Sequence, residues 1–464
     1  MFDLERVARI TAGEFSGKKS NCPLNGISTD SRNMTPGALF VPLRGERFDG
    51  HDYLSQAVKN GAAACLSEEV IEGLSVPVVR VANTLRALGD LAAAWRLQLR
   101  GPLVAVTGSA GKTTTKEMLA TILEQVGPGL KTAGNFNNLI GLPLTLFRLT
   151  SEHQWTVLEM GTSALGEIER LTEIAAPTVG IITNIGPAHL ETLHGLDGVS
   201  RAKGELFAGL HGGTAIINLD DPRVASLPVA NGVSKFTYGL AAAAQVRAEA
   251  IGATTDAVSF DLLFREERVP VRLRVPGQHN VSNALAAAAA ALVLETPLDK
   301  IVAGLEKFVP IQGRMNFFPL PCGGVLLDDS YNANPLSVAA ALSALAGLKG
   351  QGRRVAVLGD MLELGDEAAQ LHQQIGTQAA AVADLLIAVG NFAAEICRGA
   401  AAGGLTAEQL VMVADAEQAV EYLHANQRSG DRILIKGSRG VKLDRVADAL
   451  RMATEELPNG QQGG

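Results

Sequence analysis

The sequence contains few of the features that mark disulfide-rich, zinc-binding or membrane-spanning proteins. Its four cysteines are far apart and form no Cys-x-x-Cys pair, so we expect neither a disulfide framework nor a zinc site. The most apolar run, 284–294, is too short to span a bilayer, and the N-terminus carries acidic residues in place of the apolar core of a signal peptide. These absences predict a protein of the reducing cytoplasm without a membrane span.

Long runs of basic residues are also missing. The chain has 40 Lys and Arg against 48 Asp and Glu, a formal net charge of −8, so nucleic acid is not an expected partner. A polyanionic small substrate is still compatible, because basic side chains can gather locally in an acidic protein. The rest of the composition is ordinary for a globular protein, with 47% hydrophobic residues, and the length of 464 residues predicts two to four domains.

Three regions differ in their pattern of apolar residues. Residues 1–83 carry short apolar runs around one helical segment and predict a small N-terminal α/β domain. Residues 84–313 predict a P-loop-type mononucleotide-binding α/β domain with a parallel sheet, and the shorter strands at 233–275 predict an antiparallel appendage. Residues 314–456 predict a Rossmann-like, doubly wound α/β domain, and the polar stretch 457–464 predicts a flexible tail.

The strongest local motif is a phosphate-binding loop between a strand pattern and a helix pattern. Small residues there let backbone N–H groups approach phosphate oxygens, and a helix N-terminus favours negative charge. Lys112 is expected to neutralise the β- and γ-phosphates, and the Thr113 hydroxyl to bind Mg²⁺. Val106 replaces the first glycine of the general pattern GxxxxGK[ST], so the loop is a shortened form. The predicted ATP-binding residues of the loop are Thr107, Gly108, Ser109, Ala110, Gly111, Lys112, Thr113 and Thr114.

A carboxylate forms the second candidate feature. Glu159 directly follows the apolar run 156–158, and open α/β sheets bind ligands at the carboxyl ends of their strands. A hard carboxylate oxygen suits Mg²⁺, so Glu159 is predicted to hold the metal beside the nucleotide. Further along the chain, His279 and Asn283 are four residues apart and share one face if a helix begins there.

The shortened loop resembles the ATP loop of the Mur ligase family, which includes the folylpolyglutamate synthetases. Other segments over nearly the whole chain resemble motifs of the same family. They are Gly134-Asn135-Phe136-Asn137-Asn138, Leu158-Glu159-Met160-Gly161, Asn184-Ile185-Gly186-Pro187-Ala188-His189, Ala202-Lys203-Gly204-Glu205, Gly277-Gln278-His279-Asn280, Gly313-Arg314, Asp328-Asp329-Ser330-Tyr331-Asn332-Ala333-Asn334-Pro335, Gly359-Asp360-Met361-Leu362-Glu363-Leu364-Gly365 and Lys436-Gly437-Ser438-Arg439. The resemblance implies three domains that bind, in chain order, a UDP-sugar, ATP and an incoming amine.

The resemblance also implies a catalytic set with two Mg²⁺ ions. Lys203 would be carbamylated, because an ammonium group cannot bind a metal, and this requires a lysine whose depressed pKa leaves the amine neutral. Arg314 would reach the γ-phosphate when the domains close. The implied catalytic residues are Lys112, Glu159, His189, Lys203 and Arg314, and the implied metal ligands are Thr113, Glu159, His189 and Lys203.

Contacts to the nucleotide and the substrates complete the set. The resemblance implies that Asn283 contacts adenine and Asp328 the ribose, while Ser31 and Arg32 face the diphosphate of a UDP-sugar. Asn137 and Asn138 are expected to border either the muramoyl substrate or the ATP phosphates. The residues expected at the incoming dipeptide are Asn332, Asn334, Lys436 and Arg439.

Within the family, the segments most resemble those of the branch that adds D-alanyl-D-alanine to a UDP-N-acetylmuramoyl-tripeptide. A sister branch adds diaminopimelate or lysine and carries Asp-Asn-Pro-Arg in its third domain; here the nearest sequence, Asp220-Asp221-Pro222-Arg223, lies in the central region. A phosphate-loop NTPase acting as a switch or kinase is a further alternative, as is a nucleotide-binding module without catalysis. The third residue of the peptide substrate stays open, and we expect a monomer.

Overall fold

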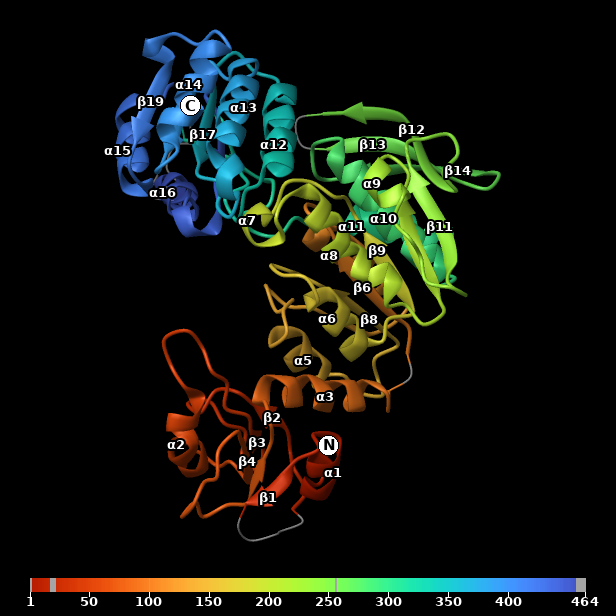
Figure 1. Cartoon of the computed structure of the whole chain (residues 1–464). Helices are drawn as coiled ribbons and strands as arrows, with labels where there is room; N and C mark the ends of the chain where they lie inside the picture. The colour runs from red at the N-terminus through yellow and green to blue at the C-terminus, as the bar shows by residue number, and fades with distance from the viewer. Residues whose placement is uncertain (1, 17–21, 100, 255–256, 322, 456–464) are drawn as a thin grey trace, which may run out of the picture.

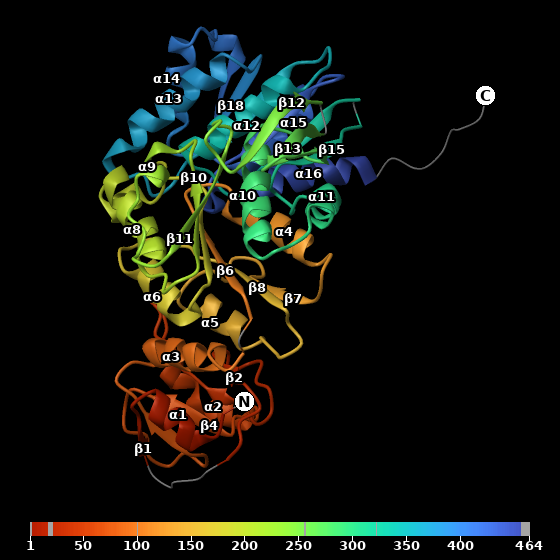
Figure 2. The same cartoon turned by 90° about the vertical axis from the view of Figure 1, so that its right-hand side faces the viewer.

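The strands of the described chain form three sheets, one in each of three successive regions of this computed structural model (Figure 1). The regions follow one another as stacked bodies, with the N-terminal region farthest from the C-terminal one in both views (Figures 1 and 2). The structure describes residues 2–16, 22–99, 101–254, 257–321 and 323–455, so the predicted tail 457–464 lies outside the described residues. Within these ranges every helix is too short or too polar to cross a lipid bilayer.

The N-terminal sheet has the strand order β1-β5-β4-β3-β2 and is parallel except for β1. Its central strands are fully buried, which explains the apolar runs in this part of the sequence. The strands are β1 (Glu14–Ser16), β2 (Ile27–Ser28), β3 (Leu39–Phe40), β4 (Ala64–Ser67) and β5 (Val78–Arg80). The helices are α1 (Leu4–Ile10), the 3₁₀ turn η1 (Gly50–Tyr53) and α2 (Leu54–Lys59).

Helix α3 (Thr84–Arg96) joins the N-terminal and central regions and packs on both. It begins at Asn83, whose side chain accepts a 2.7 Å hydrogen bond from the backbone N–H of Arg86. Leu88 and Leu91 belong to the N-terminal core, whereas Ala92 belongs to the core of the central region. The helix therefore fixes how the N-terminal region sits on its neighbour.

The central sheet has the strand order β14-β13-β12-β11-β10-β9-β6-β8-β7. Strands β6 to β11 are parallel, and β6 and β9 are buried along their whole length, as expected between two layers of helices. The strands are β6 (Leu103–Thr107), β7 (Gly129–Lys131), β8 (Trp155–Glu159), β9 (Val179–Ile182), β10 (Thr214–Asn218), β11 (Ser234–Gly239), β12 (Val246–Ala253), β13 (Val258–Phe264) and β14 (Glu267–Leu273).

The prediction of an antiparallel appendage at 233–275 was wrong in part. Strand β11 pairs with β10 in parallel, and β12 pairs with β11 in parallel, so both extend the main sheet. Only β13 and β14 are antiparallel to their neighbours. Short alternating strands look alike in sequence whether the connection makes them parallel or antiparallel, which is why the pattern was misread.

Helices cover both faces of the central sheet. Helices α4, α10 and α11 share one hydrophobic core, and α6 and α8 share another on the opposite face. The helices are α4 (Lys112–Leu123), α5 (Gly141–Leu146), α6 (Glu167–Ala175), α7 (Leu190–Leu193), α8 (Leu196–Ala208), α9 (Pro222–Ala225), α10 (His279–Val293) and α11 (Leu298–Lys307).

The C-terminal sheet has the order β15-β16-β20-β17-β18-β19 and is parallel except for the edge strand β15. Helices α12, α13 and α14 pack on one face and α15 and α16 on the other, which confirms the doubly wound prediction. The strands are β15 (Asn316–Pro319), β16 (Val325–Asp328), β17 (Arg354–Gly359), β18 (Leu385–Val389), β19 (Leu410–Val413) and β20 (Arg432–Lys436). The helices are α12 (Pro335–Gly347), η2 (Gly365–Glu367), α13 (Ala368–Ala380), α14 (Ala393–Ala402), η3 (Ala407–Gln409), α15 (Ala416–Asn426), η4 (Arg439–Val441) and α16 (Asp444–Glu455).

Candidate active site

Three neighbouring parallel strands deliver the central part of the site. Strand β6 lies between β8 and β9, with Val106 opposite Glu159 and Thr107 opposite Ile182. Their carboxyl ends therefore bring three segments to one edge of the sheet: the phosphate loop after β6, Glu159 at the end of β8, and Asn184 just after β9. This edge borders a cleft of about 990 Å³, at the upper end of the size of small-molecule sites.

Two glycines of the phosphate loop are required by its shape. Gly111 has φ +80°, and a Cβ there would lie 2.3 Å from Oδ1 of Asn283. Gly108 has φ +149°, and a Cβ there would lie 1.9 Å from Oγ1 of Thr183. Any larger residue at either position would have to displace a neighbouring strand end or helix.

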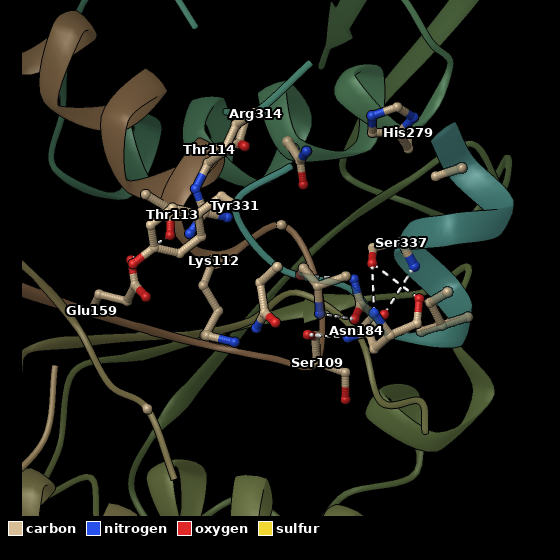
Figure 3. A pocket seen from close by; sticks show the side chains of 18 of the residues that line it. Ser109, Lys112, Thr113, Thr114, Glu159, Asn184, His279, Arg314, Tyr331 and Ser337 are labelled. Atoms are coloured by element: carbon tan, nitrogen blue, oxygen red, sulfur yellow. Dashed lines mark hydrogen bonds between the residues drawn. The ribbon is translucent and has the colours of Figure 1, made fainter. Parts of the chain in front are cut away.

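The loop is held by Thr183 and Asn184, the two residues that follow β9; Figure 3 shows Asn184. The amide of Asn184 accepts a 2.8 Å hydrogen bond from the Ala110 N–H and donates a 3.0 Å bond to the Ala110 carbonyl. The hydroxyl of Thr183 donates to the same carbonyl at 2.6 Å. Asn184 was quoted as part of a family-like segment but was given no role, although its place directly after a buried strand was the available signal.

Lys112 opens helix α4 and lies half-buried in the cleft. Its ammonium donates a 2.7 Å hydrogen bond to the Gly108 carbonyl, so the side chain curls back over the loop. Loss of hydration lowers the pKa of Lys112; the negative charge of Glu159 opposes this shift, and the positive charge of Arg314 adds to it. A cation held over the loop in this way is placed to meet phosphate oxygens.

Glu159 is buried, with 3% of its surface exposed, and its carboxylate is bonded by neutral donors (Figure 3). The Thr113 hydroxyl donates to Oε2 at 2.8 Å, and the Asn137 amide donates to Oε1 at 2.8 Å. Within the described ranges Glu159 forms no ion pair. A buried carboxylate with uncompensated charge is suited to a cation.

Lys203 lies on α8 and is buried, with 2% of its surface exposed. In the described part of the chain its amine has no hydrogen-bond or ion-pair partner. Burial, followed by the positive charge of Lys112, lowers the pKa of Lys203 well below its ordinary value. The amine is therefore disposed to be neutral, which is the state that reacts with CO₂.

His189 stands at the start of the short helix α7 and is joined to the C-terminal region. Its Nδ1 is hydrogen-bonded to the Glu363 carboxylate, and this bond lowers the pKa of Glu363. His189 and Glu159 both line the cleft. No cluster of three or more His, Cys, Asp or Glu side chains suited to a metal occurs among the described residues, so Glu159 and His189 would need further ligands, such as the Thr113 hydroxyl or a modified Lys203, to hold a metal.

The C-terminal region contributes cations and an aromatic ring to the other wall of the cleft. The guanidinium of Arg314 lies 4.3 Å from the centroid of the Tyr331 ring, and that of Arg439 lies 5.5 Å from it. Lys436 is buried and paired with Asp329 at 2.5 Å. Arg314 has no ion-pair partner among the described residues, whereas Arg439 pairs with the partly exposed Asp444 at 3.1 Å.

Comparison with known proteins decides the family. The Mur ligase middle domain model matches residues 106–291, the Mur ligase, glutamate ligase domain model matches 313–439, and the Mur ligase family, catalytic domain model matches 23–96. The chain is 40% identical over 453 residues to the UDP-N-acetylmuramoyl-tripeptide--D-alanyl-D-alanine ligase of Escherichia coli (strain K12), covering 97% of this chain and 98% of that protein. The chain belongs to the Mur ligase family.

Solved structures agree with this placement. A crystal structure of MurF from Acinetobacter baumannii matches with a TM-score of 0.89 and 35% identity, covering 97% of this chain and 98% of that one. The MurF ligase of Thermotoga maritima in complex with ADP matches with a TM-score of 0.84 and 27% identity, covering 93% and 98%. As a member of this family, the chain is an ATP-dependent ligase that forms a C–N bond.

The structure brings most of the predicted residues of this Mur ligase to one cleft. The side chain of Asn283 lies beside the loop glycine Gly111. Its Oδ1 accepts a 3.4 Å hydrogen bond from the Thr115 hydroxyl. Asn138 lines the cleft and also binds the backbone N–H of Gly141, where α5 begins. The predicted residues on the cleft wall are Ser109, Ala110, Gly111, Lys112, Thr113, Thr114, Asn137, Asn138, Glu159, His189, Lys203, Asn283, Arg314, Asn332, Asn334, Lys436 and Arg439.

Asp328, predicted as a ribose contact, is not among the residues that line the cleft. Its carboxylate is buried and accepts a 2.6 Å hydrogen bond from the Ser330 hydroxyl, and burial raises its pKa. The next residue, Asp329, lines the cleft instead. Side chains alternate between the faces at a strand end, so the carboxylates of these two adjacent aspartates face different surroundings.

Two further side chains already have partners within the protein. Lys436, predicted to bind a dipeptide carboxylate, is paired with Asp329, and its ammonium also donates to the Asn332 carbonyl at 2.9 Å. Asn334, predicted for the same pocket, caps helix α12 and donates a 3.0 Å hydrogen bond to the Ser109 carbonyl of the phosphate loop. Asn334 therefore links two regions of the chain.

Ser31 and Arg32, predicted to face a diphosphate, lie in the N-terminal region and do not line this cleft. Arg32 is exposed and pairs with Asp30 at 2.9 Å, and this pairing lowers the pKa of Asp30 to about 2. Thr107 and Gly108, predicted to bind ATP, are also absent from the lining of the cleft. The Thr107 hydroxyl donates a 2.8 Å hydrogen bond to the Met160 carbonyl.

Proposed function

We propose that this Mur ligase joins D-alanyl-D-alanine to UDP-N-acetylmuramoyl-tripeptide and converts ATP to ADP and phosphate. The observation that carries the proposal is the single cleft that collects a phosphate loop, the buried Glu159 and Lys203, and the arginines of another region. Relatives of this chain that bear this activity in their names are 34–40% identical over nearly its full length. The product would be a UDP-linked pentapeptide for the bacterial cell wall, made in the cytoplasm.

The first step transfers a phosphoryl group. The terminal carboxylate of the tripeptide attacks the γ-phosphorus of ATP, the bond to the β–γ bridging oxygen breaks, and an acyl phosphate and ADP result. The N–H groups at the start of α4 and the Lys112 ammonium stabilise the charge that spreads over the phosphate oxygens. Activation is needed because a free carboxylate is a poor electrophile.

The second step forms the amide. The neutral amine of D-alanyl-D-alanine attacks the acyl carbon, phosphate leaves with the C–O electron pair, and the amine loses a proton. Arg314 and Arg439 on the C-terminal wall are placed to bind anionic groups, namely the transferring phosphoryl group and the carboxylate of the dipeptide. Excluding water from the cleft protects the acyl phosphate from hydrolysis.

Two Mg²⁺ ions are part of the proposal. Their ligands would be Thr113, Glu159, His189 and a carbamate on Lys203, formed when the neutral amine adds CO₂ and releases a proton. Two observations support this set: Glu159 is buried, and the buried amine of Lys203 has no partner among the residues that the structure describes. When bound, Mg²⁺ would neutralise charge on the phosphate oxygens.

The remaining assignments follow the chain order. Residues 1–83 would hold the UDP-sugar, with Ser31 and Arg32 at its diphosphate; 84–313 would bind ATP; and 314–456 would bind the dipeptide. Asn283 would face the adenine, and Asp329 rather than Asp328 would be available to the ribose. We expect the chain to act as a monomer.

Phosphate release from MgATP tests the proposal. It should require both UDP-N-acetylmuramoyl-tripeptide and D-alanyl-D-alanine, and omission of either should reduce it to background. Release that ignores D-alanyl-D-alanine but responds to diaminopimelate or lysine, with the dipeptide precursor, would move the chain to the sister branch. Release indifferent to every amine would leave a nucleotide hydrolase and end the proposal.

A further inference from the structure

We propose that Glu363 of the C-terminal region is a positioning residue for His189: it fixes the imidazole through Nδ1 and so makes the metal-binding half of the cleft depend on the docked C-terminal region. The inference rests on the proposed function only in assigning His189 to a divalent cation. In the sequence, Glu363 lies within the family-like segment Gly359-Asp360-Met361-Leu362-Glu363-Leu364-Gly365, to which no catalytic or binding role was assigned.

The ring of His189 has two nitrogens, and one of them is already engaged. Nδ1 is bonded to the Glu363 carboxylate, so Nε2 is the nitrogen left to bind a cation. Histidine ligands in proteins usually donate their second N–H to a carboxylate or carbonyl, which fixes the ring orientation and makes the ligand nitrogen more basic. The unusual point here is that the carboxylate belongs to a different region of the chain.

The loop that carries Glu363 is fixed by hydrogen bonds on its own side. The Asp360 carboxylate accepts from the N–H groups of Asn391 and Phe392, both at 2.9 Å. The Leu362 N–H donates to the Ser438 hydroxyl at 2.9 Å. Glu363 itself has φ +64°, a left-handed conformation that a residue other than glycine adopts only when its surroundings enforce it.

A buried histidine completes this support. The Met361 N–H donates to Nε2 of His372 at 2.8 Å, so Nδ1 of that ring carries the proton and donates to the Ala368 carbonyl at 2.6 Å. The ring is fully buried and stacks on Phe392 with centroids 4.3 Å apart. His372 thus holds the backbone two residues before Glu363.

The backbone of Glu363 also docks directly on the central region. The Glu191 N–H donates to the Glu363 carbonyl at 3.2 Å. Gly365 has φ +57°, and a Cβ there would lie 3.1 Å from the Glu191 Cα. The backbone two residues after Glu363 therefore also lies close to Glu191. Both the carbonyl and the carboxylate of one residue therefore meet the α7 segment.

Stability cannot be the main consequence of the side-chain pair. The Glu363 side chain is 55% exposed and that of His189 33% exposed, and exposed ion pairs contribute little to folding. Asn334 and Leu336 hold the same two regions together elsewhere, through Ser109 and Gly186. Removing the carboxylate should leave the regions docked and release only the orientation of the ring.

The test is a Mn²⁺ titration of the full chain followed by electron paramagnetic resonance, with a non-hydrolysable ATP analogue present. Glu363→Ala should weaken Mn²⁺ binding about tenfold, because orienting partners of metal ligands have effects of this order. Glu363→Gln, whose amide oxygen can still accept from Nδ1–H, should recover most of the affinity. Glu367→Gln is the matched control. It removes an exposed acid from η2, just after Glu363, and should leave the affinity for Mn²⁺ unchanged.

A double-mutant cycle separates positioning from a general effect. His189→Ala and His189→Ala with Glu363→Ala should bind Mn²⁺ equally weakly, because Glu363 acts only through the ring. Unchanged affinity in Glu363→Ala, additive losses in the double variant, or no Mn²⁺ binding by the wild-type chain would each overturn the inference. None of these readouts needs turnover, a UDP-linked peptide or an amine, so failure of the proposed function would be seen separately, in the phosphate-release assay.

Discussion

Two buried side chains of the cleft, Glu159 and Lys203, have no ion-pair partner among the described residues, which leaves both groups available to a ligand. Glu159 is bonded by a hydroxyl and an amide, and Lys203 has no hydrogen-bond partner in the described residues. Opposite charges beside them would have satisfied each group but would also have competed with a ligand. The side chains of Glu159 and Lys203, both buried, therefore line the same cleft without a charged partner between them in the described residues.

His279 provides a test at this scale through pH. Burial, opposed by Asp329 and aided by Lys436, lowers the pKa of His279 to about 4 from 6.5. Between pH 6.5 and about pH 4, His279 is therefore protonated in the unfolded chain but not in the folded chain. The contribution of neutral His279 to the free energy of unfolding is thus present above pH 6.5 and is lost as pH falls towards 4. Because the ring is partly exposed, we expect a loss of about 1–2 kcal/mol by pH 5.

The measurement is urea unfolding at pH 7 and pH 5, followed by intrinsic fluorescence. The midpoint of the wild-type chain should fall by more than that of His279→Asn, which keeps a polar side chain but cannot take up the proton. Equal pH dependence in the two proteins would refute the assignment of this titration to His279.

At the residue scale, the sequence located the groups that a strand end or a loop brings to the cleft, but it did not decide which of two adjacent residues faces the cleft. The loop residues and Glu159 follow from one strand–loop–helix pattern. Asp328 and Asp329 are adjacent and chemically identical, and only the register of β16 decides which of them lines the cleft. The partners of Lys436 come from segments more than a hundred residues away in sequence, which no local pattern reveals.

Among the elements, the turn from β6 into α4 leaves little room for a larger side chain. The left-handed conformation of Gly111 and its close approach to Asn283 in α10 mean that the loop, α4 and α10 share one fixed arrangement. A side chain at this position would be strained by its φ and would push the loop away from α10.

Gly111→Ala should therefore lower kcat/KM for ATP by about 100-fold or more, because the loop N–H groups lose their alignment with the phosphates. Gly166→Ala is a suitable control, since Gly166 is also left-handed, with φ +85°, but a Cβ there meets nothing within 4 Å. Steady-state kinetics with varied ATP measure the effect. If both variants lost activity alike, the strain alone would be responsible, and the contact with Asn283 would be irrelevant.

Most elements could be predicted from apolar periodicity, since strands buried on both faces read as continuous apolar runs. The exceptions have a common cause. Strands β11 and β12 were read as an antiparallel group, and the edge strand β15 was not predicted, because direction and pairing depend on the connections and on neighbours far away in sequence.

For the whole molecule, the contact between the central and C-terminal regions is the feature that assembles the cleft. One hydrophobic core runs from α6 and α8 of the central region to α12 and α13 of the C-terminal region. Leu336 packs so closely on Gly186 that a Cβ on this glycine would lie 2.1 Å from the leucine. Three domains were predictable from the sequence, but the faces that meet were not.

Asn334→Asp tests this contact without removing the helix cap. Aspartate can still cap α12, but it would present an acceptor where Asn334 Nδ2 now donates to the Ser109 carbonyl. Two facing acceptors should weaken docking by about 1–3 kcal/mol, raise KM for ATP and increase the radius of gyration in small-angle X-ray scattering. Asn83→Asp, at the cap of α3, should do neither, and an effect of equal size there would refute the account of Asn334.

The account as a whole is tested most directly by following the oxygen atoms of the tripeptide carboxylate. The chain would be incubated with MgATP, D-alanyl-D-alanine and UDP-N-acetylmuramoyl-tripeptide labelled with ¹⁸O in its terminal carboxylate. The masses of the products would then be measured by mass spectrometry. We predict a UDP-linked product extended by one dipeptide, and released phosphate that carries one ¹⁸O atom from the acyl phosphate. Unlabelled phosphate, or a UDP-linked substrate left unchanged while ATP is consumed, would contradict the account.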